Sequence, residues 1–170
     1  DGAGFVRGVK RKGFDLTGKR VLVVGTGGVG SAIAASLAAE KIQAISLFDL
    51  NPVSFAGLAQ RLKNEYPQIQ VQTGSNDPDG HDLVVNATPL GMNEGDPLPM
   101  DVSRISPNAF VGEVVMRTEM TAFLLAAQRR GCQVQVGSDM LFEQIPAYLE
   151  YFGLKTTTAE VLRKLSRIEQ

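Results

Sequence analysis

One stretch decides the fold: Val21-Leu22-Val23-Val24-Gly25-Thr26-Gly27-Gly28-Val29-Gly30-Ser31-Ala32. An apolar, β-branched run leads into a glycine cluster, and an alanine-rich helical pattern follows directly. The glycines are spaced G-x-G-x-x-G, with Gly25, Gly27 and Gly30 in the fingerprint positions. In this pattern the first glycine permits a tight turn, the second lets backbone approach a pyrophosphate, and the third lets helix and strand pack closely. The stretch therefore predicts a strand, a phosphate-binding loop and a helix from about Val29 whose N-terminus favours an anion.

An acidic residue follows at the distance that a dinucleotide site requires. Asp49 lies nineteen residues beyond Gly30 and ends a second apolar run, Ala44-Ile45-Ser46-Leu47-Phe48. A carboxylate there accepts hydrogen bonds from both hydroxyls of an adenosine ribose and repels a 2′-phosphate. NAD is therefore the expected coenzyme, with NADP less favoured; a purely structural βαβ unit is the alternative interpretation.

Composition excludes several classes of function. The 170 residues are 44% hydrophobic and 21% charged, an ordinary mix for a globular domain with its own core. The formal net charge is −1 and Lys and Arg are scattered, which argues against a nucleic-acid surface. The apolar runs are too short to cross a membrane. Cys132 is the only cysteine, so no disulfide framework and no metal site are expected, and a cytoplasmic location fits.

Strand-like and helical patterns alternate along the chain. Strands are predicted over 19–24, 43–49, 69–73, 82–86, 109–115 and 133–136. Helices are predicted over 5–13, 29–39, 52–66, 121–130, 140–151 and 159–168. This alternation predicts an α/β fold with a doubly wound parallel sheet, in one domain over residues 1–170.

In such sheets ligands bind beyond the carboxyl ends of the strands, where the strand order reverses. The segments expected to meet there are 25–30, Asp49, 86–89 and 113–116. Asn86, Thr88 and Pro89 stand where a strand ends, so they could contact the ribose of a nicotinamide, although they also suit a simple strand-ending turn.

Three other features receive plain structural interpretations. His81 precedes Asp82 in a polar turn and is expected to be solvated. Cys132 is expected to be a small buried or half-buried residue. Arg129 and Arg130 end a predicted helix, where positive charge complements the helix dipole.

Four motifs follow one another in fixed order. They are Asp1-Gly2-Ala3-Gly4-Phe5, the glycine loop with its double Gly27-Gly28, Val85-Asn86-Ala87-Thr88-Pro89-Leu90-Gly91-Met92, and a Gly137-x-x-Met140-Leu141-x-x-Gln144 stretch running to Phe152-Gly153. Together they resemble the shikimate and quinate dehydrogenases over nearly the whole chain. The resemblance implies a Rossmann-like coenzyme-binding domain without the N-terminal substrate domain and its catalytic lysine, toward which the C-terminal helices 140–151 and 159–168 would pack.

The resemblance also implies roles for individual residues. Asp1 corresponds to the catalytic Asp beside the hydroxyl that is oxidised, and Asp1 and Gln144 would bind a cyclic hydroxy acid such as shikimate or quinate. The implied coenzyme contacts are Gly25, Thr26, Gly27, Gly28, Val29, Gly30, Asp49, Leu50, Asn86, Ala87, Thr88, Pro89, Val115, Gly137 and Met140. This chain alone is expected to bind coenzyme without turnover.

Each of these assignments has a plainer alternative. Asp1 also suits the N-cap of the first helix, Gln144 by its spacing alone is a solvated side chain, and Met140 is ordinary core filler. A homodimer is compatible with the sequence.

Departures from the family pattern leave the substrate open. The family usually has an acidic-x-x-Tyr-x-Pro stretch where this chain has Glu113-Val114-Val115-Met116-Arg117-Thr118, and Phe152 stands where tryptophan is usual. One alternative function is a non-catalytic NAD-sensing module. Another, less favoured, is an ATP-binding adenylating domain, which shares Gly-x-Gly-Gly-x-Gly but has an arginine signature and zinc cysteines that this sequence lacks.

Overall fold

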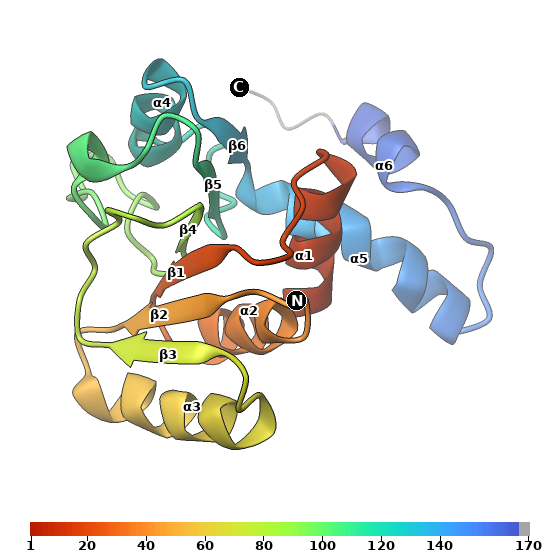
Figure 1. Ribbon diagram of the computed structural model, residues 1–170. Helices are drawn as coiled ribbons and strands as arrows, with labels where there is room; N and C mark the ends of the chain where they lie inside the picture. The colour runs from red at the N-terminus through yellow and green to blue at the C-terminus, as the bar shows by residue number, and fades with distance from the viewer. Residues whose placement is uncertain (167–170) are drawn as a thin grey trace.

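The computed structural model describes residues 1–166, which form a six-stranded parallel sheet with helices on both faces (Figure 1). The strands are β1 (Arg20–Val24), β2 (Ala44–Phe48), β3 (Gln70–Thr73), β4 (Leu83–Asn86), β5 (Phe110–Glu113) and β6 (Gln133–Gln135). Their order is β3-β2-β1-β4-β5-β6, so the order reverses between β1 and β4. The predicted doubly wound α/β fold is confirmed.

The helices are α1 (Gly2–Arg11), α2 (Gly28–Ala38), α3 (Pro52–Glu65), the short 3₁₀ helix η1 (Val102–Arg104), α4 (Ala122–Arg129), α5 (Gly137–Tyr151) and α6 (Ala159–Leu165). None of them, within the described part of the chain, combines the length and the apolar character that crossing a membrane requires. The predicted helix 159–168 is shorter in the structure, where α6 ends at Leu165 with Ser166 as its C-cap; residues from 167 on lie outside the described part of the chain.

Several predicted boundaries are wrong, and three of them are instructive. The first helix begins at Gly2 and not at Phe5, and α5 begins at Gly137 and not at Met140. Glycine lowers helix propensity, but at both places tertiary packing against a neighbouring backbone outweighs that local cost. The strand predicted over 109–115 ends at Glu113, because its neighbour β4 ends at the paired Asn86.

Each face of the sheet has its own apolar core. On one face the helices α1, α2 and α3 and Met140 of α5 cover side chains of β1, β2, β4 and β5. On the other face η1 and α4 cover alternate side chains of β1, β4 and β5, such as Leu22, Val84 and Val111. This alternation follows from the two-residue period of a strand buried on both sides.

Helix α1 packs unusually close to its neighbours. A Cβ at Gly112 of β5 would lie 2.7 Å from Cζ of the fully buried Phe5, and a Cβ at Gly4 would lie 2.5 Å from the carbonyl oxygen of Met140. The side-chain amide of Gln135 also donates a hydrogen bond of 3.0 Å to the Phe5 carbonyl oxygen. These contacts hold the N-terminus of α1 beside α5.

The structure revises two of the plain side-chain interpretations. His81 is half-buried and not simply solvated: its Nε2 lies 2.9 Å from Ser46 Oγ, and burial lowers its pKa. Cys132 is 5% exposed, as expected, and burial raises the pKa of its thiol. Arg130 does more than face the helix dipole, because its Nη2 donates a hydrogen bond of 2.7 Å to the carbonyl oxygen of Ile105.

Adding a methyl group at Gly112 should strain the contact with Phe5. We expect Gly112→Ala to lower the free energy of unfolding by about 1–3 kcal/mol, because overpacking displaces a buried ring. In the control Gly57→Ala the new Cβ meets only Arg61 Nη1, at 3.7 Å, on a helix. That control should gain up to about 1 kcal/mol of helix propensity. Urea denaturation measures both, and an unchanged midpoint for Gly112→Ala would contradict the packing argument.

Candidate functional site

A cavity of about 960 Å³ opens at the carboxyl ends of β1 and β4, where the strand order reverses. Its wall includes ten of the predicted coenzyme contacts: Gly25, Gly27, Gly28, Val29, Asp49, Leu50, Ala87, Thr88, Pro89 and Val115. The other five (Thr26, Gly30, Asn86, Gly137 and Met140) are not part of this wall. The predicted residues therefore divide into those that face the cavity and those that support it.

The glycine loop lies between β1 and α2, and its glycines play two different parts. Gly25 has φ +96°, and a Cβ there would lie 2.6 Å from the carbonyl oxygen of Ala87. A Cβ at Gly30 would overlap the carbonyl oxygen of Gly25, so both glycines are needed for backbone packing.

Gly27 and Gly28 behave differently, because nothing lies within 4 Å of a Cβ built on either. Gly27 is also the N-cap of α2 and provides no side-chain cap for the first N–H groups of that helix. An open cavity wall, free backbone N–H groups and the positive end of a helix dipole favour a bound anion at this point.

Asp49 is held in one orientation at the end of β2. Its Oδ2 accepts hydrogen bonds from Thr26 N at 2.7 Å and Thr26 Oγ1 at 3.2 Å, and its Oδ1 accepts from Asn51 N at 2.9 Å. The backbone N–H groups of Asn51 and Thr26 lower the pKa of Asp49, so the cavity edge carries a negative charge. Thr26, 3% exposed, thus contacts Asp49 and not open space. The neighbouring Leu50 is 91% exposed.

Asn86 shapes the turn that carries the opposite wall of the cavity. It is fully buried, and its Oδ1 accepts hydrogen bonds from Thr88 N at 3.1 Å and Thr88 Oγ1 at 2.6 Å. Its Nδ2 donates to Leu90 O at 3.0 Å and to Glu113 Oε2 at 3.4 Å. These contacts match the alternative interpretation of Asn86 and Thr88 as part of a simple strand-ending turn.

Glu113 lies beneath the cavity and not in its wall. It is fully buried, and its Oε1 accepts a hydrogen bond of 2.7 Å from Thr121 Oγ1. Burial raises the pKa of Glu113 even though Thr121 and Asn86 donate to it. Val114, Val115 and Met116, the rest of the segment predicted to meet at the crevice, do line the cavity.

Asp1 and Gln144 meet at the N-terminus of α1. With its amide nitrogen toward Asp1, Gln144 donates to Asp1 Oδ1 at 3.0 Å and accepts from the Tyr148 hydroxyl at 2.6 Å. Gln144 is 8% exposed, which differs from the solvated side chain that spacing alone favours. The side chain of Asp1 makes no capping hydrogen bond to α1, so its carboxylate is not needed as a helix cap.

Gly137 brings the start of α5, the helix that carries Gln144, against the cavity wall. A Cβ there would overlap the carbonyl oxygen of Val115, so only glycine lets the start of α5 reach the cavity wall. Met140, 4% exposed, packs in the core over α1 and the sheet, which fits its plainer interpretation. Helix α5 therefore packs against the cavity wall at its first residue and carries Gln144 seven residues further along.

The loop between β4 and η1 also forms part of the wall, which sequence reasoning did not foresee. Met92, Pro97, Leu98 and Pro99 line the cavity, as does Arg117. The signal available in the sequence was the run Pro97-Leu98-Pro99, since two prolines around a leucine favour a stiff apolar segment.

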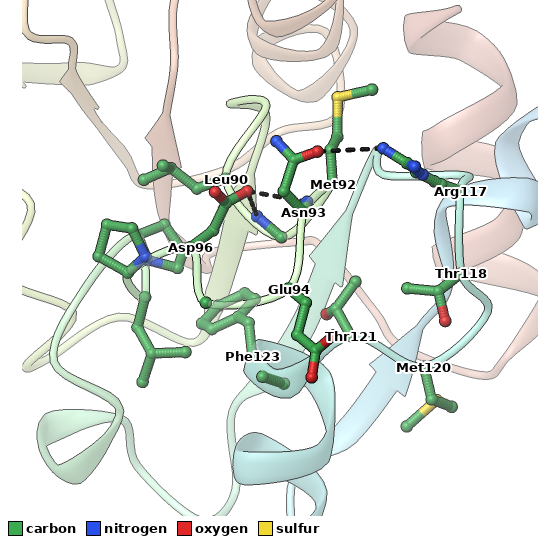
Figure 2. Close-up of a pocket in the computed structure, with 16 residues that line it drawn as sticks. Leu90, Met92, Asn93, Glu94, Asp96, Arg117, Thr118, Met120, Thr121 and Phe123 are labelled. Atoms are coloured by element: carbon green, nitrogen blue, oxygen red, sulfur yellow. Dashed lines mark hydrogen bonds between the residues drawn. The ribbon is translucent and has the colours of Figure 1, made fainter.

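Figure 2 shows how this loop is held, around an adjacent pocket of about 420 Å³. Asp96 Oδ2 accepts hydrogen bonds from Gly91 N and Asn93 N, each at 3.0 Å. Arg117 Nη1 donates to Asn93 Oδ1 at 3.0 Å, which ties the loop to the segment after β5. The loop is thus braced from within and from the segment that carries Met116.

Comparison with known proteins gives a consistent set of relatives, although no family model matches the chain. The shikimate dehydrogenase (NADP(+)) of Rubrobacter xylanophilus is 32% identical over 171 residues, covering 98% of this chain and 60% of that protein. The shikimate dehydrogenase (NADP(+)) of Moorella thermoacetica is 37% identical over 153 residues, covering 85% of this chain and 51% of that protein.

Among solved structures, the quinate dehydrogenase from Corynebacterium glutamicum in complex with NAD is 30% identical with a TM-score of 0.82. The match covers 95% of this chain and 59% of that one, so the chain spans little more than half the length of these relatives. Over nearly all of its residues the chain is therefore similar in sequence and in fold to the shikimate and quinate dehydrogenases, and its parallel sheet matches their dinucleotide-binding domain.

Proposed function

We propose that this chain is the coenzyme-binding part of an oxidoreductase that transfers hydride between NAD and a secondary alcohol on the ring of a cyclic hydroxy acid, such as shikimate or quinate. The observation that supports this most is the junction of two sites. Helix α5 links the two, because its first residue, Gly137, packs against Val115 of the cavity wall and its Gln144 lies beside Asp1.

The cavity fits a dinucleotide in size and in chemistry. Its volume of about 960 Å³ lies in the upper range for small-molecule sites, roughly 300–1,000 Å³. Gly27 and Gly28 leave open space at the N-terminus of α2 for a pyrophosphate, while Ala87, Val115 and Met116 offer an apolar wall. A bound nicotinamide supplies hydride chemistry, and these residues bind and orient it.

The preference for NAD rests on Asp49. The relatives include enzymes named for NADP(+) and one solved with NAD, so they leave the choice open. The Asp49 carboxylate is ionised and held by Thr26 and Asn51, so it cannot turn away from a 2′-phosphate without breaking those hydrogen bonds. Two like charges about 4 Å apart repel by roughly 1–4 kcal/mol near a protein surface.

Asp1 and Gln144 would contact the substrate. The exposed Asp1 carboxylate would accept a hydrogen bond from the hydroxyl being oxidised and help its proton to leave. Gln144, already held by the Tyr148 hydroxyl, would bond a second hydroxyl of the ring. The partner base and most substrate contacts would come from a substrate domain, so the chain alone would not turn over.

The C-terminal helices offer a surface for that domain. Tyr151, Phe152 and Leu154, at the end of α5, are 83%, 70% and 59% exposed, although large apolar side chains are usually covered. We propose that a substrate domain packs against α5 and α6. A homodimer and a cytoplasmic location remain predictions.

A non-catalytic NAD-binding sensor is the second candidate. Met116 and Arg117 stand where the family usually has a Tyr-x-Pro stretch, and Met116 is 42% exposed at the cavity wall. Its thioether cannot donate a hydrogen bond to substrate as a phenol does. The adenylating-enzyme alternative finds no support among these relatives.

Coenzyme binding tests the role of Asp49. The chain has no tryptophan, so the fluorescence of NADH and NADPH themselves is the appropriate signal. NADH should bind at least about tenfold more tightly than NADPH, because the 2′-phosphate faces a fixed carboxylate. Asp49→Asn should narrow this ratio mainly by improving NADPH binding, while the exposed control Glu65→Gln should leave it unchanged. Equal affinities in the unaltered chain would remove Asp49 from coenzyme selection.

Turnover tests the role of Asp1 in the complete protein, with shikimate and quinate as substrates. Asp1→Asn should lower kcat by about 10²-fold or more while the KM for coenzyme changes little, because proton handling and not coenzyme binding is lost. Gln144→Ala should raise the KM for the hydroxy acid. Glu65→Gln again serves as the control. Coenzyme binding without any turnover in the unaltered protein would favour the sensor.

A further inference from the structure

A network of six charged side chains joins α5 to α1 and α6, and neither the cavity nor the Asp1–Gln144 pair includes any of them. Asp139 and Glu143 of α5 are only 6% and 4% exposed. Arg11 and the C-cap residue Lys12 come from the end of α1, and α6 contributes Glu160 and Arg163. Three positive charges therefore meet three negative ones.

The contacts are short and several are doubled. Arg163 bridges both carboxylates, with Nε 2.8 Å from Asp139 Oδ1 and Nη2 3.1 Å from Glu143 Oε1. Arg11 forms a bidentate ion pair with Glu143, with Nε 2.9 Å from Oε1 and Nη2 3.0 Å from Oε2. Lys12 Nζ lies 2.7 Å from Asp139 Oδ2, and Arg11 Nη1 lies 3.0 Å from Glu160 Oε1. Each buried carboxylate is thus held from two other helices.

The position of the two carboxylates on α5 gives the network its significance. Asp139 and Glu143 are four residues apart, and each directly precedes a residue assigned to the site, Met140 and Gln144. Residues four apart share one face of a helix, and the next residue lies about 100° around the axis. Holding the Asp139–Glu143 face therefore also sets the direction in which Gln144 points.

Packing holds the first turn of α5, where Gly137 meets Val115 and Met140 is buried, but no residue of α5 after Gln144 is buried. Gly4 lets the backbone of α5 approach α1 but offers no side chain to interlock with it. Pro146 removes one hydrogen bond from within the helix. Tyr148 and Tyr151, in the last turns, are 49% and 83% exposed and make little packing contact. Beyond the first turn of α5, the ionic contacts are the directional restraints.

We propose that Arg11, Lys12 and Arg163 are positioning residues that hold Asp139 and Glu143 and thereby keep Gln144 turned toward Asp1. The proposal rests on the proposed function, because it gives Gln144 its place against the substrate. Buried ion pairs add little net stability compared with apolar residues of similar volume, so the geometry that they impose is the more telling consequence.

A measurement on the chain itself tests the orientation without relying on activity. Arg163→Met removes both bridging contacts but keeps a long apolar stem. In ¹⁵N-labelled protein, the Gln144 side-chain amide signal, assigned by its loss in Gln144→Glu, should move toward that of a solvated glutamine. Amide exchange over 137–151 should accelerate at least about tenfold as the helix loosens. Arg163→Lys should recover part of both effects.

Lys10→Met provides the matched control. Lys10 is on α1 next to Arg11, but its Nζ lies 2.9 Å from Oε2 of Glu40, which follows the end of α2. It therefore makes no ion pair with α5. This variant should leave the Gln144 signal in place. If Arg163→Met does not fold, Glu143→Gln removes the charge while keeping the side-chain shape, and the same shift is expected. An unmoved Gln144 signal in a folded variant overturns the proposal.

Kinetics of the complete protein separates positioning from simple stability. Arg163→Met should lower kcat/KM for the hydroxy acid by about 10–100-fold, since a misplacement of about 1 Å has costs of this order. The KM for NAD should stay within about twofold, because the coenzyme cavity is untouched. An equal fall in kcat/KM for the hydroxy acid and for NAD would mean that the network has only a structural role, and would overturn the proposal. A Gln144 signal that shifts as expected in a protein with no turnover would instead contradict the proposed function alone.

Discussion

The contact on which the structure depends is the packing of backbone against backbone at Gly25, Gly30 and Ala87. A methyl group at either glycine would collide with main-chain atoms, so β1, the start of α2 and the end of β4 meet only because no side chain intervenes. This contact brings the free N-terminus of α2 to the point where the strand order reverses. It also leaves Gly27 and Gly28 facing the open cavity.

Around that contact the polar groups are arranged in two ways. Some are held so that they present charge to the cavity, as Asp49 is by Thr26 and Asn51. Others bond only to the protein and so support the cavity wall. Asn86 accepts a hydrogen bond within the turn that follows β4, and the buried Glu113 accepts one from Thr121. A buried carboxyl costs free energy unless it is hydrogen-bonded, so the Asn86 and Thr121 contacts fix the wall as well as satisfying Glu113.

Sequence reasoning located most of the cavity because local patterns carry that information. The glycine spacing, the acid after the second strand and the turn after the fourth strand each depend on nearby residues and on the topology of parallel sheets. The same reasoning missed the wall formed by Pro97, Leu98 and Arg117, because a loop's path depends on distant contacts such as Arg117 with Asn93. It also placed His81 in solvent, since its partner Ser46 is on another strand.

The sequence by itself determined the α/β fold, the parallel order of elements and the position of the glycine loop between β1 and α2, because glycine spacing and apolar periodicity follow from backbone sterics and burial. Only the tertiary structure decided which way polar side chains face. Thr26 turns to Asp49, Gln144 turns to Asp1, and α1 and α5 each begin earlier than their local propensity indicates. These outcomes depend on partners far apart in the chain, which close packing brings within hydrogen-bond distance.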